Sequence, residues 1–173
     1  MASADRKEAQ QEIGEGDVQT WPYEADDGDH FETSKEAYED VAPLLRFAAR
    51  SQARAGGWAK QGAEARLRIY DPYFCSGRAR VLLTDLGFPN VSHRRRDFYK
   101  DIADGTVPRF DVLLTNPPYS GDHKERLLQF VLDRQRLAAD SAGDPAAGVP
   151  FMLLLPSWTV GKAFFRSFLR DLG

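Results

Sequence analysis

The chain has 173 residues, a formal net charge of −3, 42% hydrophobic residues and 28% charged residues. This composition indicates one globular domain with a buried core and excludes a disordered or fibrous protein. No apolar run approaches the ~20 residues of a membrane span, and the amino-terminal residues lack the apolar stretch of a secretory signal. The one cysteine excludes an intrachain disulfide framework. We therefore expect an intracellular protein without a membrane partner, in the cytoplasm, the nucleus or an organelle.

The order of polar and apolar segments predicts one domain after a short lead-in. Residues 1–29 are expected to form a flexible polar segment, and residues 30–173 the domain. Thr33 or Ser34 is a candidate N-cap for a helix over residues 35–53, which Pro43 should kink or divide. Further helices are expected at 78–86, 123–139 and 162–172, and strands at 67–70, 91–96, 110–114 and 150–155. This alternation predicts an α/β fold with a mostly parallel sheet and helices on both faces.

The segment from Asp71 to Gly77 joins the first predicted strand to a helix. Such a turn brings backbone N–H groups and a helix N-terminus to the carboxyl edge of the sheet, where ligands bind. Gly77 lets the backbone approach a ligand closely, and Asp71 can orient an amino group directly or through water. The alternative is an ordinary strand–turn–helix connection with an aspartate cap.

The most specific signal is Asn-Pro-Pro-Tyr at residues 116–119, directly after the third predicted strand. Two prolines fix the backbone and hold carbonyl groups rigidly at the sheet edge. The Asn116 side-chain oxygen and the Pro117 carbonyl can then accept both hydrogens of one NH₂ group and free the lone pair of its nitrogen. Pro118 completes the rigid turn, and Tyr119 offers an aromatic face for a flipped base. The alternative is a proline-rich loop with an asparagine turn residue.

These two segments resemble motifs I and IV of the S-adenosylmethionine-dependent methyltransferases that modify amino groups. Their motif I reads Asp-Pro-Phe-Cys-Gly-Ser-Gly, and here the row is Asp-Pro-Tyr-Phe-Cys-Ser-Gly, with Cys75 in place of the first glycine. The resemblance implies a Rossmann-like class I methyltransferase sheet and S-adenosyl-L-methionine as cofactor. It further implies cofactor contacts from five residues of this turn: Asp71, Pro72, Tyr73, Cys75 and Gly77.

Two weaker matches extend the resemblance. Phe31 and Thr33 are similar to a Phe-x-Thr-Pro segment that contacts the methionine end of the cofactor, and a helix N-cap is the alternative. Asp97 and Phe98 resemble the Asp-Phe of motif III, which implies that they bind the adenine of the cofactor. At this distance from Gly77, Asp97 is also placed to bind ribose hydroxyls or to be a solvated residue that pairs with Arg94 to Arg96.

The two motif segments lie close together in the sequence. The interval from Asp71 to Asn116 is too short for three β–α units, so we expect one to be missing or reduced to a turn. The order of motifs, ending in Pro150–Pro156, is similar to that of uncharacterised methyltransferase-like proteins of large viruses and protists. The antiparallel hairpin that ends a class I sheet is not expected before Gly173. We therefore expect an incomplete domain, a protein partner that completes the sheet, or a degenerate subunit.

The resemblance predicts methylation of an exocyclic amino nitrogen, adenine N6 in DNA or RNA, with nucleic acid as partner. Guanine N2 of ribosomal RNA and a protein glutamine amide present the same planar NH₂ group, and an inactive structural subunit is the third alternative. No zinc or other metal site is expected, because Cys75 has no ligand partner nearby in sequence. We expect residues 93–96 to form a solvated edge strand and His123, Lys124 and Arg126 to form a polar first helical turn or to contact a nucleic-acid backbone.

Overall fold

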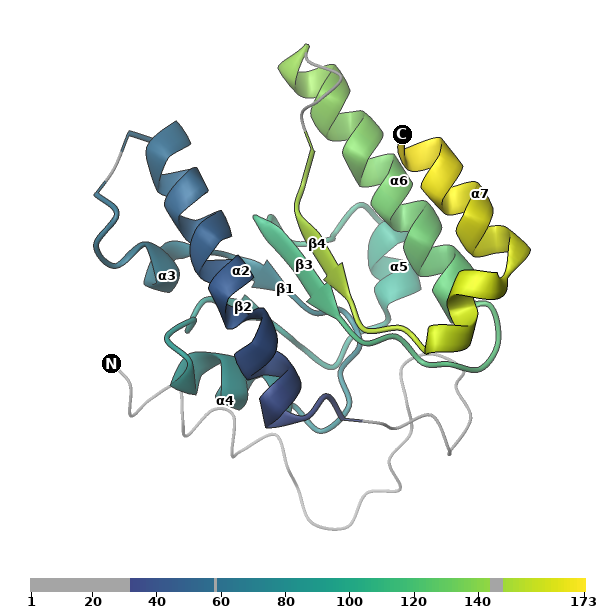
Figure 1. Ribbon diagram of the computed structural model, residues 1–173, viewed down its shortest axis with the longest axis horizontal. Coiled ribbons are helices and arrows are strands. Elements are labelled where there is room, and N and C mark those ends of the chain that lie inside the picture. Colours follow the sequence, from purple (N-terminus) through teal and green to yellow (C-terminus); the bar gives the residue numbers. More distant parts are fainter. Residues whose placement is uncertain (1–31, 58, 144–147) are drawn as a thin grey trace.

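The computed structural model describes residues 32–57, 59–143 and 148–173. Its centre is a four-stranded sheet in the order β2–β1–β3–β4, in which every pair of neighbours is parallel (Figure 1). The α/β class and the parallel sheet are therefore confirmed. The strands are β1 (Ile69–Tyr70), β2 (Val91–Ser92), β3 (Val112–Thr115) and β4 (Phe151–Leu153).

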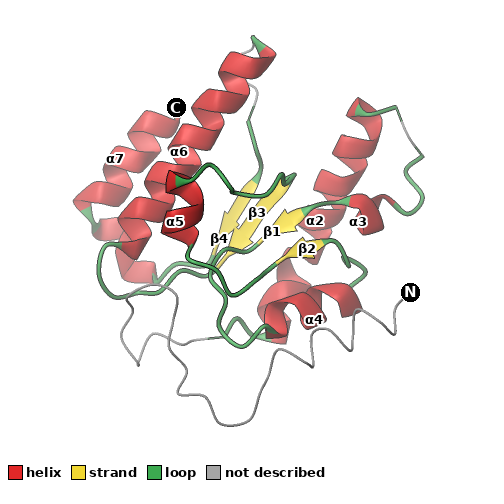
Figure 2. Ribbon diagram, turned by 180° about the vertical axis from the view of Figure 1, so that it is seen from behind, coloured by secondary structure: helices red, strands yellow, loops and turns green. Residues whose placement is uncertain are grey.

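Helices cover both faces of the sheet (Figures 1 and 2). Successive strand residues point to opposite faces, so Val112 and Leu114 join one core while Leu113 joins the other. The first core is formed with α2 (Lys35–Ala55), α3 (Ala63–Arg66) and α4 (Arg78–Asp85). The second is formed with α5 (Phe98–Ala103), α6 (His123–Ala142) and α7 (Ala163–Leu172). A short 3₁₀ helix, η2 (Ser157–Gly161), joins β4 to α7.

The long helices follow the predicted ranges closely. Ser34 is the N-cap of α2, and its side chain accepts a hydrogen bond from the Ala37 N–H at 3.2 Å. Pro43 lies inside α2, which continues past it as one helix. Helices α3 and α5 and the 3₁₀ helix η2 were not predicted, because each is too short to show a helical apolar period.

The second strand is shorter than predicted. Only Val91 and Ser92 pair with β1, and the chain then turns, with the Arg96 N–H donating to the Arg94 carbonyl at 2.9 Å. The predicted edge strand over residues 93–96 is therefore wrong. The turn leads directly into α5, because Asp97 is its N-cap.

The compact connection between the two motif segments is confirmed. Only α4, β2, α5 and β3 lie between Asp71 and Asn116, so this interval holds two helical connections rather than three β–α units. The starts of β1 and β3 are joined by an ion pair in which Arg68 Nη2 lies 2.5 Å from Asp111 Oδ1. This pair aligns the two strands whose carboxyl ends carry the predicted site.

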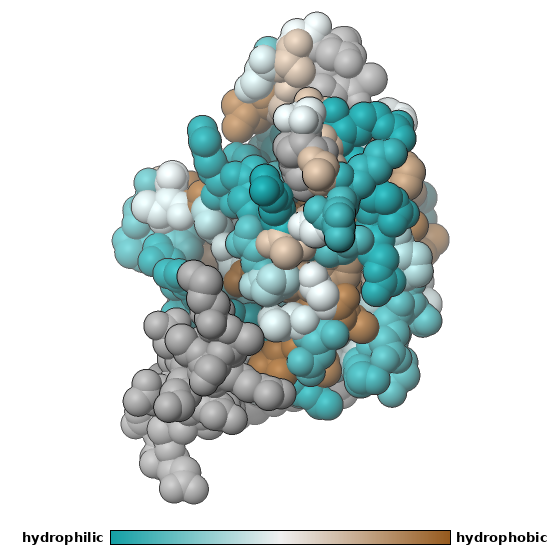
Figure 3. All heavy atoms as spheres, turned by 90° about the vertical axis from the view of Figure 1, so that its left-hand side faces the viewer, coloured by the Kyte–Doolittle hydropathy of each residue, from teal (hydrophilic) through white to brown (hydrophobic). Residues whose placement is uncertain are grey.

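Hydrophilic residues cover much of the side of the molecule nearest α3 (Figure 3). Two apolar side chains of α2 are nevertheless exposed, Leu44 at 56% and Phe47 at 65%. In the described part of the chain, no helix combines the length and apolarity that crossing a membrane requires.

Candidate functional site

A cavity of about 330 Å³, including its open mouth, lies at the carboxyl edge of the sheet. Three neighbouring strands each contribute the residue that follows them: Asp71 after β1, His93 after β2 and Asn116 after β3. The carboxyl ends of parallel strands are where α/β folds bind ligands. The structure brings together six predicted residues in this lining, Thr33, Asp71, Tyr73, Cys75, Gly77 and Asn116. Six further lining residues were not predicted, Glu32, Tyr38, Ser76, Arg78, Ala79 and His93.

The carboxylate of Asp71 is buried and fixed by neighbouring groups. Its Oδ1 accepts hydrogen bonds from Thr115 Oγ1 at 2.5 Å and from the Tyr73 N–H at 3.3 Å. Thr115 is the last residue of β3, so this bond ties the ends of β1 and β3 together at the cavity. A carboxylate has about four acceptor positions, so Asp71 retains capacity for a ligand amino group.

His93 is the principal residue that the sequence analysis missed. It is 4% exposed, and its Nδ1 lies 3.3 Å from both Asp71 Oδ2 and the Asp71 carbonyl oxygen. Its ring stacks on Phe74 with centroids 4.9 Å apart. Burial opposes protonation, but the carboxylate of Asp71 and the hydrogen bonds to it outweigh burial and raise the pKa of His93. Its Nε2 is buried and makes no hydrogen bond to any described residue.

Gly77 shapes the turn that borders the cavity. Its φ of 82° lies in the left-handed region, and a Cβ atom there would lie 3.0 Å from Phe74 Cζ. Only glycine adopts this conformation beside a closely packed ring without strain. Helix α4 starts at the next residue, Arg78, so its N-terminus faces the cavity as predicted for this turn.

Glu32 and Asp71 are the two acidic residues of the cavity lining. Burial, followed by the charges of Glu32 and Asp71, raises the pKa of the Cys75 thiol. The thiol therefore stays neutral near pH 7, which argues against a thiolate nucleophile. Arg78 Nη1 lies 3.3 Å from Glu32 Oε2 at the exposed mouth, where solvent weakens the pair. The lining thus combines these two acidic residues with the basic residues Arg78 and His93.

The Asn-Pro-Pro-Tyr loop leaves β3 with only Asn116 lining the cavity. Pro117 and Pro118 are buried, and Tyr119 is half-buried. Lys124 holds the loop from α6, since its ammonium donates to the carbonyls of Tyr119 and Ser120. Lys124 lies in the first turn of α6, as predicted, but it is only 3% exposed.

Behind the cavity, Tyr73 belongs to an aromatic cluster that includes Phe98. Phe98 is 1% exposed and packs edge-on against Tyr73, with centroids 5.3 Å apart. It lies in the core and does not line the cavity, contrary to its predicted contact with adenine. The hydroxyls of Tyr73 and Tyr99 lie 3.1 Å apart, and the Tyr99 hydroxyl contacts Nδ1 of the buried His123. Burial raises the pKa of Tyr99 to about 12, so its hydroxyl is neutral.

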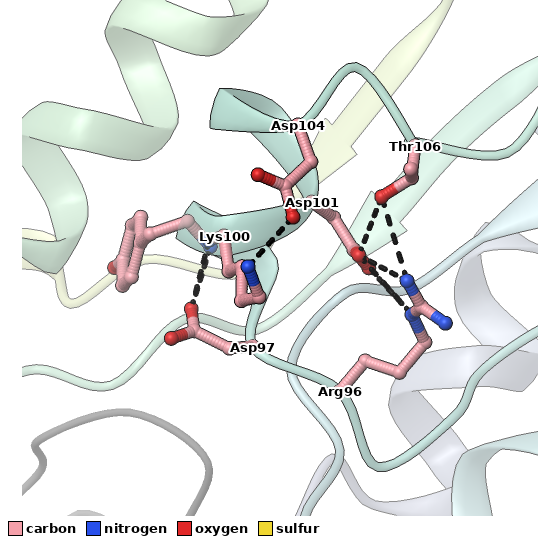
Figure 4. Close-up of polar contacts among 7 residues, drawn as sticks. Arg96, Asp97, Lys100, Asp101, Asp104 and Thr106 are labelled. Atoms are coloured by element: carbon pink, nitrogen blue, oxygen red, sulfur yellow. Dashed lines mark hydrogen bonds and ion pairs between the residues drawn. The ribbon is translucent and has the colours of Figure 1, made fainter.

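Asp97 is not among the residues that line the cavity, and Figure 4 shows its carboxylate beside the start of α5. Its Oδ1 accepts hydrogen bonds from the N–H groups of Tyr99 at 2.9 Å and Lys100 at 3.1 Å, as an N-cap does. Of the three arginines expected as alternative partners of Asp97, Arg96 binds Asp101 instead. The structure thus places His93, and not Asp97, at the end of β2.

Two other predicted contacts fall elsewhere. Pro72 borders a separate cavity of about 620 Å³ that also holds Arg94 and Arg96. Phe31 lies outside the described residues. Within the described ranges, His, Cys, Asp and Glu form no group of three or more that could hold a metal ion.

Comparisons with known proteins identify no relative. No family model matches the sequence, and neither a curated protein nor a solved structure matches the chain. Function must therefore be argued from the cavity and its residues.

Proposed function

We propose that this chain transfers a methyl group from S-adenosyl-L-methionine to an exocyclic amino nitrogen, adenine N6 of DNA or RNA. The observation that carries the proposal is the convergence of Asp71, His93 and Asn116, from three adjacent strand ends, on one cavity. The sheet is compatible with a shortened Rossmann-like arrangement, in which a ligand binds across the carboxyl ends of the strands.

The residues of the cavity fit this cofactor. The carboxylates of Asp71 and Glu32 suit the sulfonium and ammonium groups of S-adenosyl-L-methionine. Gly77 lets the turn approach the ligand closely. The Nε2 of His93, which has no hydrogen-bond partner among the described residues, suits a ribose hydroxyl, which can both donate and accept.

When bound, the cofactor supplies an electrophilic methyl group. Asn116 positions the acceptor, because its side-chain oxygen and the Pro117 carbonyl accept hydrogen bonds from the NH₂ group. These bonds direct the nitrogen lone pair toward the methyl carbon. The amine becomes cationic as the N–C bond forms and the S–C bond breaks, and its proton then passes to solvent. No strong base is required, since positioning and electrostatics supply most of the acceleration.

Guanine N2 and a glutamine amide are alternative acceptors, because each presents a planar NH₂ group of the same kind. Product analysis separates them. The chain is incubated with S-adenosyl-L-methionine labelled at the methyl group and with RNA, single-stranded DNA or a glutamine-containing peptide. Label in N6-methyladenosine or N6-methyladenine supports the proposal, and label in guanine or glutamine assigns the alternative.

Calorimetry tests the cofactor, and a pair of asparagine variants tests the acceptor role. We expect heat of binding for S-adenosyl-L-methionine with the wild-type chain and with Asn116→Ala. Turnover of Asn116→Ala should fall by about 100-fold or more, the loss typical of one positioned polar group. Asn90→Ala is the matched control, because Asn90 is exposed and its Nδ2 donates to the Arg66 carbonyl, away from the cavity. Absence of binding by the wild-type chain would favour an inactive structural subunit.

A further inference from the structure

Helix α7 presents a basic face to solvent. Lys162 is its N-cap, and Arg166 and Arg170 follow at intervals of four residues, so the three side chains lie along one side of the helix. All three are exposed. Phe168, by contrast, is 4% exposed and packs against Phe151 of β4 with centroids 6.1 Å apart. The apolar side of α7 thus faces the core and leaves the basic side open to solvent.

Trp158 of η2 connects this basic face to the Asn-Pro-Pro-Tyr loop. Trp158 is 49% exposed, and its ring centroid lies 5.5 Å from Lys124 Nζ and 5.3 Å from Lys162 Nζ. Lys124 also donates to the carbonyls of Tyr119 and Ser120. A half-exposed aromatic ring therefore lies near both Lys124, which holds the motif loop, and Lys162, the first residue of the basic face.

The distribution of charge along the chain agrees with an anionic partner at this face. The chain carries a net charge of −3, but residues 1–31 hold nine acidic and two basic residues. Residues 32–173 hold 21 Lys and Arg against 17 Asp and Glu and are therefore net positive. On α7 itself, Asp171 is the acidic residue, and its Oδ1 lies 3.4 Å from Arg170 Nε in an exposed pair. The acidic balance of the whole chain is thus set by residues 1–31.

We propose that the η2–α7 surface, formed by Trp158, Lys162, Arg166 and Arg170, binds single-stranded nucleic acid and directs it to the motif loop. The cations match the spaced negative charges of a phosphate backbone, and the half-exposed indole offers a stacking face to an unpaired base. A duplex offers no such unpaired base along its length. That the bound base is then methylated rests on the proposed function. Binding itself is measured without cofactor.

The test is fluorescence anisotropy of a labelled single-stranded oligonucleotide with the full chain over a range of salt concentrations. The triple variant Lys162→Gln, Arg166→Gln, Arg170→Gln should bind more weakly and reduce the slope of log affinity against log salt by about 2, at roughly 0.7 for each lost phosphate contact. Trp158→Ala should weaken binding by about tenfold with the slope unchanged, because stacking carries no counterion release. The matched control is Arg50→Gln, Arg54→Gln, Lys60→Gln, which removes the same charge from exposed positions in and after α2.

Wild-type affinity and salt slope in the η2–α7 triple variant would overturn the proposal. An equal loss of oligonucleotide affinity in the control triple variant would also overturn it. Tighter binding of a duplex of equal length would overturn the assignment to single strands. Circular dichroism establishes that both triple variants are folded. Nucleic acid bound at this surface without methyl transfer would refute the proposed function alone. Methyl transfer with an unchanged KM for the oligonucleotide in the triple variant would refute this inference alone.

Discussion

Replacement of Lys124 by methionine tests how the Asn-Pro-Pro-Tyr loop is held. Lys124 is 3% exposed, and its ammonium donates to two loop carbonyls, those of Tyr119 and Ser120. Methionine keeps much of the side-chain length and fills apolar space, but it donates no hydrogen bond. The variant therefore removes the loop anchor with a small change in packing.

The expected effect follows from these two bonds. Hydrogen bonds to a charged group contribute about 1.5–3 kcal/mol each, and the freed carbonyls recover part of this energy from water. We expect a net loss of about 2 kcal/mol in the stability of the ordered loop, which lowers its population relative to other conformations by roughly 30-fold. Lys124→Arg should retain part of the anchor, because guanidinium also donates to carbonyls.

Steady-state methyl transfer and calorimetry measure the outcome. Lys124→Met should lower kcat by about tenfold or more, while the affinity for S-adenosyl-L-methionine stays close to wild type, since Lys124 does not line the cavity. The kcat of Lys124→Arg should lie between those of the wild type and Lys124→Met. A kcat equal to wild type in Lys124→Met would refute the anchoring role. Weaker cofactor binding with kcat preserved would contradict the view that Lys124 supports the Asn-Pro-Pro-Tyr loop and not the Asp71–Gly77 turn.

Further predictions concern the turn and the ion pairs near the site. Gly77→Ala should lower the free energy of unfolding by more than Gly87→Ala does. Both glycines have positive φ, which costs alanine roughly 1–2 kcal/mol, but only Gly77 has a ring within 4 Å of the added Cβ. Urea unfolding of both variants measures the difference. The pKa of His93 is raised, so the stability that its charged form contributes is complete below the unfolded pKa of about 6.5 and is lost as pH rises through the native pKa. Urea unfolding of a His93→Gln variant should not show this decline in the free energy of unfolding. The hydrogen bond from Arg96 lowers the pKa of Asp101, so the stability that this pair contributes is present above about pH 3.9 and is lost as pH falls through the native pKa. Asp101→Asn should flatten the acid dependence of the free energy of unfolding. An unchanged dependence on pH would contradict the pairing.

The sequence predicted the two sides of the cavity because both follow apolar strands. Ile69–Tyr70 and Val112–Thr115 are buried throughout, so their ends were visible as the points where polar residues begin. Parallel strands place those ends at one edge, and this alone brings Asp71 near Asn116. The role of each residue toward a cofactor and an acceptor stays a prediction.

The residues missed by sequence reasoning depend on where the second strand ends. His93 precedes three arginines, and this run indicated a solvated strand. In the structure β2 stops at Ser92, and the next side chain is buried against Asp71. Asp97 gave the signal that could have located this end, because it is an N-cap residue followed by a helical segment. A cap at residue 97 leaves no room for a strand through residue 96.

The burial of Lys124 could not be read from its residue type. Lysine is almost never fully buried unless it is paired, and its partners here are backbone carbonyls of a proline-rich loop. Backbone partners leave no pattern in the sequence. The same holds for Trp158, whose position beside Lys124 depends on how η2 packs.

A crystal structure with S-adenosylhomocysteine tests the central claim most directly. The predicted result is ligand density in the cavity, with the sulfur atom between the Asp71–Gly77 turn and the Asn116 side chain, and His93 Nε2 within hydrogen-bond distance of a ligand hydroxyl. Ligand bound elsewhere, or Asn116 turned away from the sulfur atom, would contradict the claim that the two loops form one methyl-transfer site.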